Sequence, residues 1–458
     1  MSQGQYEDRL KNWKYKATTR SQEISYLKKR IKELIVSRDN WKRKYMASNK
    51  STEIDLSSGR KAKSHHYSLL LVSLLVDLYR YGSMSLRSCR HTLISLSFYL
   101  GVEGRIPSHT SIRNWLCKCG SYRLDTSFSQ SEEYVVYLDE SISFGSEKIL
   151  LMLGVPSSAI PEDRSLSHHD MEVLYVGVSH EWKGEQIAQE LANIGTNKTI
   201  SYVVSDQGSN LRKAYKSLNY SHVEDCTHLL ANHLKKLYGQ DETFMGFSKL
   251  IGKLRQKWNL SKDHSQYMPP SMRGKLRFAN IFPCVSWAKK MIDQMGGLPL
   301  EVAEQLSFLV THKSFIEELV AVQSIFKTVC TDLKNNGFNS ISQQAILNKL
   351  TLIETQTCGE LSPKALAFKA HCENYLAHLE AKSRELNQSF LLCSSDIIES
   401  YFGKFKTKIN PNSRSGLTEF IFTIATFGKR FSVQETKKAL ENVKCKDLKL
   451  KKITKQAA

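Results

Sequence analysis

The chain has 458 residues, 41% of them hydrophobic, and this length favours about three folded domains. Its 65 Lys and Arg residues outnumber 45 Asp and Glu residues, so the formal net charge is +20 at pH 7. A membrane protein or a disulfide scaffold is not expected, because the apolar runs are far shorter than a membrane span, the first residues lack an apolar signal core, and the ten cysteines form no CxxC pair. We therefore expect a soluble protein in a reducing, cytoplasmic compartment.

The basic surplus is concentrated at the two ends of the chain. Residues 1–63 hold 17 Lys or Arg against 7 Asp or Glu, and residues 429–458 hold 10 against 3. Basic ends of this kind suit a polyanion, so the composition favours binding to nucleic acid. Ordinary solvation of exposed helices is the alternative explanation.

The first 60 residues predict one long helix with a heptad seam, because seam residues alternate spacings of three and four. The seam is Leu10, Trp13, Ala17, Arg20, Ile24, Leu27, Ile31, Leu34, Arg38, Trp41 and Tyr45. Two arginines interrupt its apolar character, but no proline breaks the helix. A coiled coil that joins two copies of the chain is the first interpretation, and a long helix packed on its own chain is the alternative.

Residues 64–125 predict a small all-helical domain. Apolar periodicity favours helices over about 67–80 and 85–100, and Ser108 can cap a third helix that Gly120 ends. This layout is typical of a helix-turn-helix DNA reader, whereas a helical bundle without DNA contact is the alternative.

The third helix of this domain has an apolar face and a polar face. Ile112, Trp115 and Leu116 are spaced to form the buried side. The polar side, which would meet base edges in the major groove, comprises His109, Arg113, Asn114 and Lys118. Cys117 and Cys119 lack a second cysteine pair, so a place on the helix is favoured over a zinc site.

From Tyr134 the pattern changes to short strands alternating with helices. Strands are predicted at 134–138, 148–154, 174–178, 200–204 and near 222–224, with helices at 184–193, 209–218 and 228–238. This order is typical of an RNase H-like α/β sheet, in which the first and fourth strands lie side by side. Ligands gather at the carboxyl ends of such strands, and here those ends carry Asp139 and Asp206.

Residues 240–390 predict a helical insertion, because their apolar residues follow a helical period without a convincing strand. We expect Trp258 and Trp287 in this insertion to be core residues, with stacking on a flipped base as the alternative. The motif His168-His169-Asp170 lies in a predicted loop and is interpreted as a surface feature.

The core is expected to resume with a helix over 395–408. Its apolar stripe, which can pack on the sheet, comprises Ile398, Tyr401, Phe402, Phe405 and Ile409. Glu399 flanks this stripe and would point at the strand ends. Lys404 and Lys406 on the same helix are predicted to bind DNA.

The predicted fold class is therefore an α/β RNase H-like core interrupted by an all-helical insertion and preceded by a coiled coil and a helix-turn-helix domain. The predicted segments are a coiled coil at 1–60, a helix-turn-helix domain at 64–125, the first part of the core at 131–239, the insertion at 240–390, the final core helix at 391–430 and a basic tail at 431–458.

Three carboxylates, Asp139, Asp206 and Glu399, are the candidate metal ligands. Two Mg²⁺ ions, or Mn²⁺ in their place, prefer such oxygen ligands and can stabilise both the attacking and the leaving oxygen at phosphorus. Each acid also has a plainer interpretation: Asp139 as a turn residue, Asp206 as a helix cap, and Glu399 as a capping partner of Asp396.

These motifs resemble those of the DDE transposases, which cut and join DNA at the ends of mobile elements. The matching segments are Tyr137-Leu-Asp-Glu140, Ser205-Asp-Gln-Gly208, Asp225-Cys-Thr-His228 and Glu399-Ser-Tyr-Phe-Gly-Lys-Phe-Lys406. The long insertion before the last acid resembles the hAT-like layout. Together, the order and spacing of the motifs carry more weight than any one of them.

The resemblance implies a division of roles among four residues. Asp139 would bridge both metals, Asp206 would hold one and Glu399 the other, while His228 would contact the scissile phosphate or steady the site. The implied partners are the terminal inverted repeats of an element, its target DNA and further copies of the chain in a homodimer or larger multimer. A bacterial-type, nucleoid-associated protein would fit this activity.

Two other functions stay open at this point. One is a sequence-specific DNA-binding regulator derived from a transposase with an inactive core. The other is a recombinase that attacks DNA through Tyr401, although no Arg-His-Arg set precedes this tyrosine.

Overall fold

The computed structural model describes residues 3–48, 59–100, 104–126, 132–140, 145–161, 164–259, 264–271, 281–356, 361–409, 416–450 and 452–453. The chain divides into two compact units. The first comprises residues 1–58 and 92–106, and the second comprises 59–91 and 107–458. The linker predicted after residue 50 lies largely outside the described residues.

The first unit contains one long helix, α1 (Gln3–Ser48), together with the second half of α3 (Leu86–Leu100). The heptad residues in the middle of α1 are exposed although they are apolar: Ile24, Leu27, Ile31 and Leu34 retain 52%, 50%, 54% and 56% of their accessible surface. The described residues therefore leave this seam without an apolar cover.

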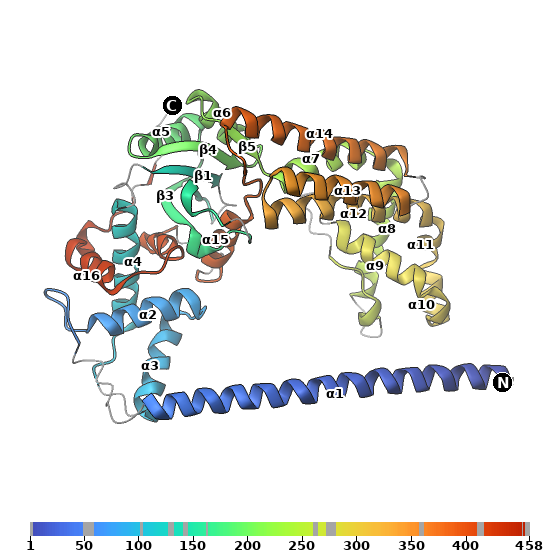
Figure 1. Cartoon of the computed structure of the whole chain (residues 1–458), viewed down its shortest axis with the longest axis horizontal. Coiled ribbons are helices and arrows are strands. Elements are labelled where there is room, and N and C mark those ends of the chain that lie inside the picture. Colours follow the sequence, from blue (N-terminus) through green and yellow to red (C-terminus); the bar gives the residue numbers. More distant parts are fainter. Residues whose placement is uncertain are drawn as a thin grey trace. The chain divides into compact units, whose positions relative to one another are not determined.

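The second unit is built around one mixed sheet (Figure 1). Its strands are β1 (Glu133–Glu140), β2 (Lys148–Pro156), β3 (Glu172–Ser179), β4 (Thr199–Ser205), β5 (His222–Glu224) and β6 (Lys452–Ile453), in the order β5-β4-β1-β2-β3-β6. β1 and β4 are parallel neighbours. The predicted adjacency of the first and fourth strands is therefore confirmed.

The two faces of this sheet pack against different helices, because successive strand residues point to opposite sides. Tyr134, Val136 and Leu138 of β1 belong to a buried cluster with side chains of α5 (Gly184–Gly195) and α6 (Ser209–Ser217). Figure 1 shows α5 and α6 on one side of the sheet and α15 (Asp396–Lys406) on the other. Val135, Tyr137 and Asp139 alternate onto the α15 side.

A helical layer formed by α2 (Leu69–Tyr81), α4 (His109–Thr126), η6 (Glu419–Thr426) and α16 (Val433–Asn442) also belongs to the second unit. The prediction that Gly120 ends the third helix is wrong, since α4 continues for two more turns. A Cβ atom at Gly120 would lie only 1.9 Å from the carbonyl oxygen of Phe422. Gly120 therefore allows the close contact between α4 and η6, and it does not end the helix.

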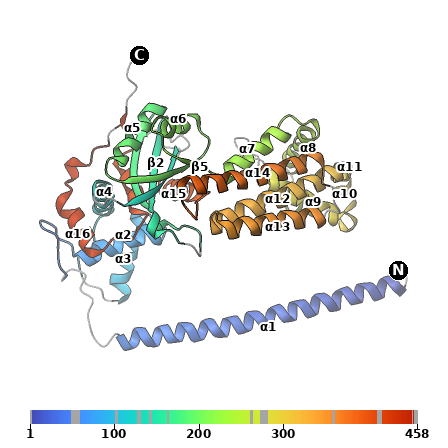
Figure 2. The same ribbon diagram turned by 45° about the horizontal axis from the view of Figure 1, so that its top comes forward.

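The predicted insertion contains α8 (Glu242–Trp258), α9 (Phe282–Asp293), α10 (Leu300–Gln305), α11 (Ser307–Thr311), α12 (Lys313–Asn336), α13 (Ser340–Gln356) and α14 (Pro363–Leu386). Figures 1 and 2 show α12 and α14 running beside α7 (Cys226–Tyr238), while α13 packs against α12 and α14. Trp258 and Trp287 are buried, and their indole N–H groups donate to Gln305 Oε1 at 2.8 Å and to Tyr267 O at 2.9 Å. Their predicted role as core residues is confirmed.

Candidate functional site

The first two predicted acids lie at the ends of adjacent parallel strands. The register pairs Tyr137 with Val204 and Leu138 with Ser205, so Asp139 and the first residue after β4, Asp206, come next in the two strands. Val203 belongs to the cluster on the α5 side, so alternation places Asp206 on the opposite face, as it does Asp139. Register and alternation together bring these two carboxylates to one edge and one face of the sheet.

The backbone after β4 orients Asp206. Its Oδ1 accepts a hydrogen bond of 2.8 Å from the N–H of Gly208, the residue that caps α6. A Cβ atom at position 208 would lie 2.9 Å from this same oxygen, so the glycine leaves room for the turn. The interpretation of Asp206 as a helix cap is therefore wrong, because Gly208 occupies the cap position of α6 and no side chain caps this helix. The turn uses one oxygen of the Asp206 carboxylate, which is compatible with a ligand role.

The third acid, Glu399, lies on α15 and faces His228 at the start of α7. His228 Nε2 and Glu399 Oε1 are 3.2 Å apart. Ile398, Tyr401, Phe402 and Phe405 are buried, as the predicted apolar stripe requires. α15 also contacts β1, the strand that carries Asp139.

A buried carboxylate, Asp225, joins the two helices that carry His228 and Glu399. Asp225 caps α7 by accepting a hydrogen bond of 2.6 Å from the N–H of His228. Its other oxygen accepts from the N–H and the hydroxyl of Ser395, the residue before α15, at 2.6 and 2.9 Å. We call these bonds the Asp225 clamp, because they fix the start of α15 against the start of α7.

The chain segment that leads into α15 has further anchors on the core. The N–H of Leu392 donates to the Tyr202 hydroxyl at 2.9 Å, and the N–H of Cys226 donates to the carbonyl of Cys393 at 2.8 Å. Residues 391–395 thus run along the end of β4 before α15 begins. These contacts specify the position of Glu399 although 193 residues separate it from Asp206 along the chain.

The competing acid on α15, Asp396, is engaged by the insertion. Its Oδ2 lies 2.5 Å from Nζ of Lys334 in α12 of the insertion. Ser395 occupies the cap position of α15, and its side chain makes no capping hydrogen bond. Asp396 is thus paired with a lysine of the insertion, whereas Glu399 faces His228.

The donor set has the oxygen chemistry that Mg²⁺ prefers, since carboxylates meet at the strand ends. In the described parts of the chain, however, no three His, Cys, Asp or Glu side chains are arranged to hold a metal ion together. The structure thus brings Asp139 beside Asp206 and Glu399 beside His228, in two pairs. Sequence reasoning missed Ser395 and Tyr202, which position the site, because a cap and a buried hydroxyl have no motif of their own.

The predicted DNA-binding side chains of α4 differ in their surroundings. Lys118 was expected on the exposed face, and this is wrong: it is buried, and its Nζ donates to the carbonyl of Leu440 at 3.2 Å. His109 is exposed, Asn114 is half-buried, and Arg113 lies 3.5 Å from Glu419. The packing of α16 against α4 explains the burial, which no pattern within α4 itself could indicate.

The two predicted lysines of α15 are both half-buried. Lys404 lies over the ring of Phe427 at 4.8 Å, and burial, with Arg80 and Lys408 nearby, lowers its pKa to about 8. Cys117 and Cys119 are buried on α4, and burial raises the pKa of each thiol to about 12. This setting agrees with structural cysteines and not with zinc-bound thiolates.

The motif His168-His169-Asp170 forms a short 3-10 turn that contacts α15. The ring of His168 lies 4.7 Å from that of Tyr401, and the Tyr401 hydroxyl donates to the carbonyl of His168 at 3.3 Å. Arg164 binds Asp170 through two hydrogen bonds of 2.7 and 2.8 Å. None of the three residues is buried and His169 is exposed, so the motif lies at the surface as expected, and it also contacts α15.

His222 supports the end of β4 and makes the fold sensitive to acid. Its Nε2 lies 2.9 Å from the hydroxyl of Ser205, its ring stacks on Tyr215 at 4.1 Å, and burial lowers its pKa to about 4. An unfolded histidine has a pKa of about 6.5, so the unfolded state takes up this proton first as the pH falls. Stability contributed by neutral His222 is therefore present above about pH 6.5 and is lost towards pH 4.

We expect the His222→Phe variant to lose less stability on acidification than the wild type. Phenylalanine keeps a ring against Tyr215 but has no proton to gain, so the difference in free energy of unfolding between about pH 7 and pH 4.5 should shrink by about 1 kcal/mol or more. Urea denaturation at the two pH values measures this. Equal losses in both proteins would show that His222 does not titrate with folding.

No protein-family model matches the chain, and no curated protein matches it. Among the described helices, none combines the length and the apolar character that crossing a lipid bilayer requires. The geometry of the site is thus the basis for a functional proposal.

Proposed function

We propose that this chain is a DDE-type transposase that cleaves and joins DNA at the ends of a mobile element. The observation that carries the proposal is the position of Asp139 on β1 and of Asp206 directly after β4, the parallel neighbour of β1, with Glu399 on a helix that contacts β1. The strand order β5-β4-β1-β2-β3 supports an RNase H-like core, in which acids at these positions act on phosphodiesters.

The proposed metal ligands are Asp139, Asp206 and Glu399. When bound, Mg²⁺ would polarise the scissile phosphate and lower the pKa of the attacking water. His228 holds Glu399 from the side of α7, and the Asp225 clamp keeps the two helices in contact. These contacts position the carboxylate and limit the freedom of α15, which favours a defined geometry for in-line attack.

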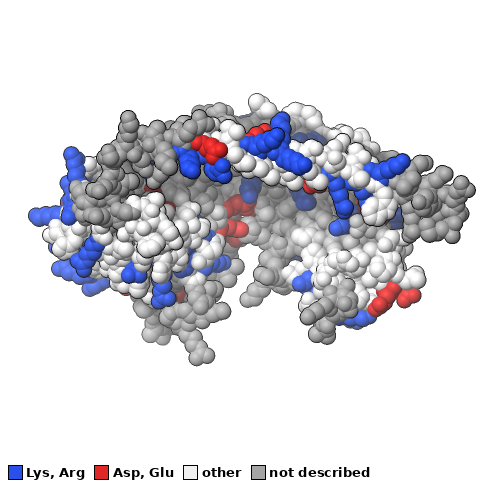
Figure 3. Space-filling view, turned by 90° about the horizontal axis from the view of Figure 1, so that it is seen from below, with Lys and Arg blue, Asp and Glu red and all other residues white. Residues whose placement is uncertain are grey.

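The basic surface supports DNA as the partner. Lys and Arg side chains are more prominent than Asp and Glu on the face shown in Figure 3. The net charge of +20 would attract the phosphate backbone over a range that salt shortens. A nucleoid-associated, cytoplasmic protein is the setting that we propose for this activity.

The decisive experiment uses DNA that carries the flanks of the gene, in which inverted repeats would mark the element ends. Mg²⁺-dependent nicking and strand joining of this DNA by the purified chain is the expected result. A DNA-binding regulator with an inactive core is the second candidate, favoured by the separation of the acids into two pairs. It predicts a specific gel shift without nicking, and a nicking assay run beside the gel shift distinguishes the two.

We also propose that α1 joins two copies of the chain in a parallel coiled coil. Ile24 and Ile31 occupy the a positions and Leu27 and Leu34 the d positions, a combination that favours two parallel strands. In that orientation Glu23, at a g position, lies opposite Lys28, at an e position of the other copy. Because the dimer is symmetric, this attractive pair occurs twice. An antiparallel pair centred on Lys28 would instead oppose lysines at the e positions Lys14, Lys28 and Lys42.

We expect the Ile24→Asp/Ile31→Asp double variant to be monomeric where the wild type is dimeric, because two carboxylates would enter the seam of each helix. Sedimentation analysis of the full chain measures the change. Ser25→Asp/Val36→Asp, which adds the same two charges at outward positions, is the control and should remain dimeric.

The orientation of the two helices has a separate test. Glu23→Lys should weaken the dimer, and adding Lys28→Glu should restore it, since the swapped pair regains its attraction. Failure of the second change to restore the dimer would contradict the parallel arrangement.

A further inference from the structure

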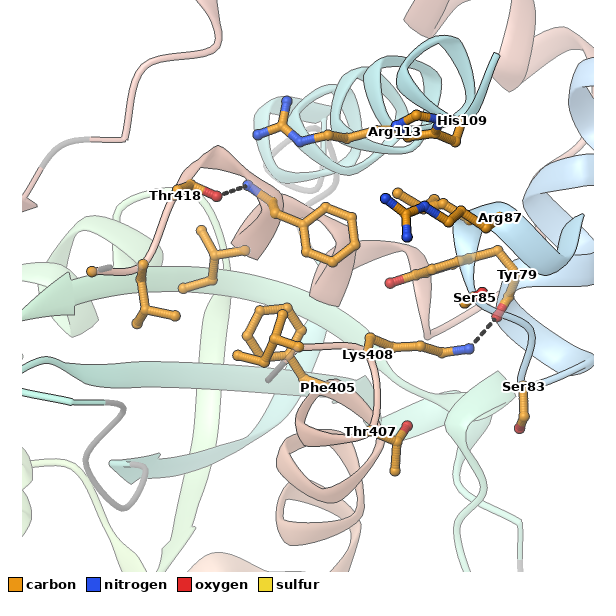
Figure 4. Close-up of a pocket in the computed structure, with 16 residues that line it drawn as sticks. Tyr79, Ser83, Ser85, Arg87, His109, Arg113, Phe405, Thr407, Lys408 and Thr418 are labelled. Carbon is orange, nitrogen blue, oxygen red and sulfur yellow. Dashed lines mark hydrogen bonds between the residues drawn. The ribbon is translucent and has the colours of Figure 1, made fainter. Parts of the chain in front are cut away.

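The second unit contains a pocket of about 600 Å³ whose lining includes none of the proposed metal ligands (Figure 4). It lies among the end of α2, the starts of α3 and α4, the end of α15 and residues 416–421. We call it the α3–α4 pocket. Its volume falls within the range of about 300–1,000 Å³ that is usual for small-molecule sites.

One side of the α3–α4 pocket is basic. Arg87 from α3 and His109 and Arg113 from α4 line it, and its described lining includes no Asp or Glu (Figure 4). Arg113 lies 3.5 Å from Glu419, whereas the described residues offer Arg87 and His109 no ion pair. Lys408 is already engaged, since its Nζ donates to the carbonyls of Tyr79 at 3.0 Å and Met84 at 2.8 Å.

Helix ends add to this positive side. Ser85 and Ser108 each accept a hydrogen bond of 3.1 Å from a backbone N–H in the first turn of α3 and α4, respectively. Leu86, Arg87 and His109, the first residues of these helices, line the pocket. The positive ends of two helix dipoles therefore coincide with the basic side chains, and an anion is favoured there.

A buried hydroxyl is directed into the same space. Tyr79 is 1% exposed, and its hydroxyl has no hydrogen-bond partner among the described residues. The neighbouring Thr423 hydroxyl donates to the carbonyl of Phe420 at 2.8 Å. Figure 4 shows the Tyr79 side chain reaching into the middle of the lining residues. A buried polar atom of this kind costs free energy unless a ligand or water satisfies it.

The opposite wall is apolar and aromatic. Phe405, Leu417, Phe420 and Ile421 line it, and the ring of Phe420 lies edge-on to that of Tyr79 at 6.2 Å. A ligand that fits the pocket would thus carry its anionic group at the helix ends and place a flat, apolar group against this wall. A nucleoside monophosphate combines these two parts.

We propose that the α3–α4 pocket binds one nucleotide, with its phosphate at the starts of α3 and α4 and its base against Phe420 and Tyr79. Six residues of α15 separate Glu399 from Phe405, about 9 Å along the helix axis, so a nucleotide in the pocket lies within reach of a strand that occupies the candidate active site. The ligand is either a free nucleotide or one unit of a DNA strand. The DNA form of the inference depends on the proposed function.

The test measures binding by the full chain in EDTA, so that no cleavage is needed. The two probes are a fluorescent single-stranded oligonucleotide and free deoxyadenosine monophosphate. Arg87→Ala should weaken binding about tenfold, the usual effect of losing one charge-assisted hydrogen bond. Arg60→Ala, which removes an exposed arginine outside the pocket, is the matched control and should bind like the wild type.

The two probes distinguish the sources of the ligand. A selective effect of Arg87→Ala on the mononucleotide assigns the pocket to free nucleotides, and an effect on the oligonucleotide alone assigns it to a DNA strand. In the second case an oligonucleotide with 5-iodouracil should cross-link to the peptide that holds Tyr79 or Phe420. Equal affinities of wild type, Arg87→Ala and His109→Ala for both probes would overturn the proposal. Binding without any Mg²⁺-dependent nicking would refute the proposed function while leaving the pocket assignment intact.

Discussion

Replacing Asp139 with Asn is expected to abolish Mg²⁺-dependent cleavage of element-end DNA while the fold is retained. Asparagine has nearly the same shape but no charge, so it would hold a divalent cation much more weakly than the carboxylate would. A loss of several kcal/mol of transition-state stabilisation corresponds to a decrease in rate on the order of 10³-fold or more. Single-turnover nicking measures the rate, and gel shift confirms that DNA binding remains.

A readout other than activity keeps this prediction independent of the substrate. Mg²⁺ or Mn²⁺ should raise the melting temperature of the wild type, because a ligand that binds only the folded state stabilises it, and Asp139→Asn should lose this effect. Glu133→Gln at the opposite end of β1 is the matched control. If cleavage by Asp139→Asn equals that of the wild type, the assignment of the metal ligands is wrong.

Replacing Asp225 with Ala is expected to destabilise the fold by about 3 kcal/mol or more, because the N–H groups of His228 and Ser395 and the Ser395 hydroxyl would lose a buried charged acceptor. The start of α15 would also become free to move, so cleavage should decrease even at temperatures where the variant is folded. Urea denaturation and nicking measure the two effects.

Asp241→Ala provides a matched comparison. Asp241 also caps a helix, since it accepts a hydrogen bond of 2.7 Å from Phe244 N, and it pairs with Lys364, but it does not contact the segment before α15. Losing this cap should cost about 1 kcal/mol. An Asp225→Ala variant that is no less stable than Asp241→Ala would show that the clamp contributes little.

The periodicity of the sequence was sufficient for β1 to β5, but it did not predict β6 (Lys452–Ile453), which lies in the predicted basic tail. Runs such as Tyr134–Leu138 are short, apolar and bounded by polar residues, and this local pattern fixes both the element type and its position. The adjacency of β1 and β4 followed from the order of elements, because short crossovers restrict the possible topologies.

Tertiary packing explains where the sequence misled. Gly120 has the local signature of a helix end, but the backbone of Phe422, about 300 residues later in the chain, makes a close approach that only glycine permits. Lys118 follows the polar period of α4, but α16 covers it. Both errors arise from partners that lie far away along the chain and leave no trace in the local pattern.

The candidate site likewise combines positions that the sequence predicts with contacts that only the folded structure reveals. The positions of Asp139 and Asp206 follow from strand ends, which sequence patterns indicate well. The role of Asp225 as a clamp depends on its contact with Ser395, 170 residues further along the chain. Only the folded arrangement reveals that the acid of the Asp225-Cys-Thr-His228 motif is a structural anchor for the helix that bears Glu399.

The hydrogen bond between Cys226 N and the Cys393 carbonyl means that the polypeptide leaves the sheet and comes back at one point. The helical segment between these two residues begins and ends at the same place on the sheet, so its length does not determine where α15 begins. A longer or shorter helical insertion between these two residues is therefore compatible with the same placement of the sheet and its acids.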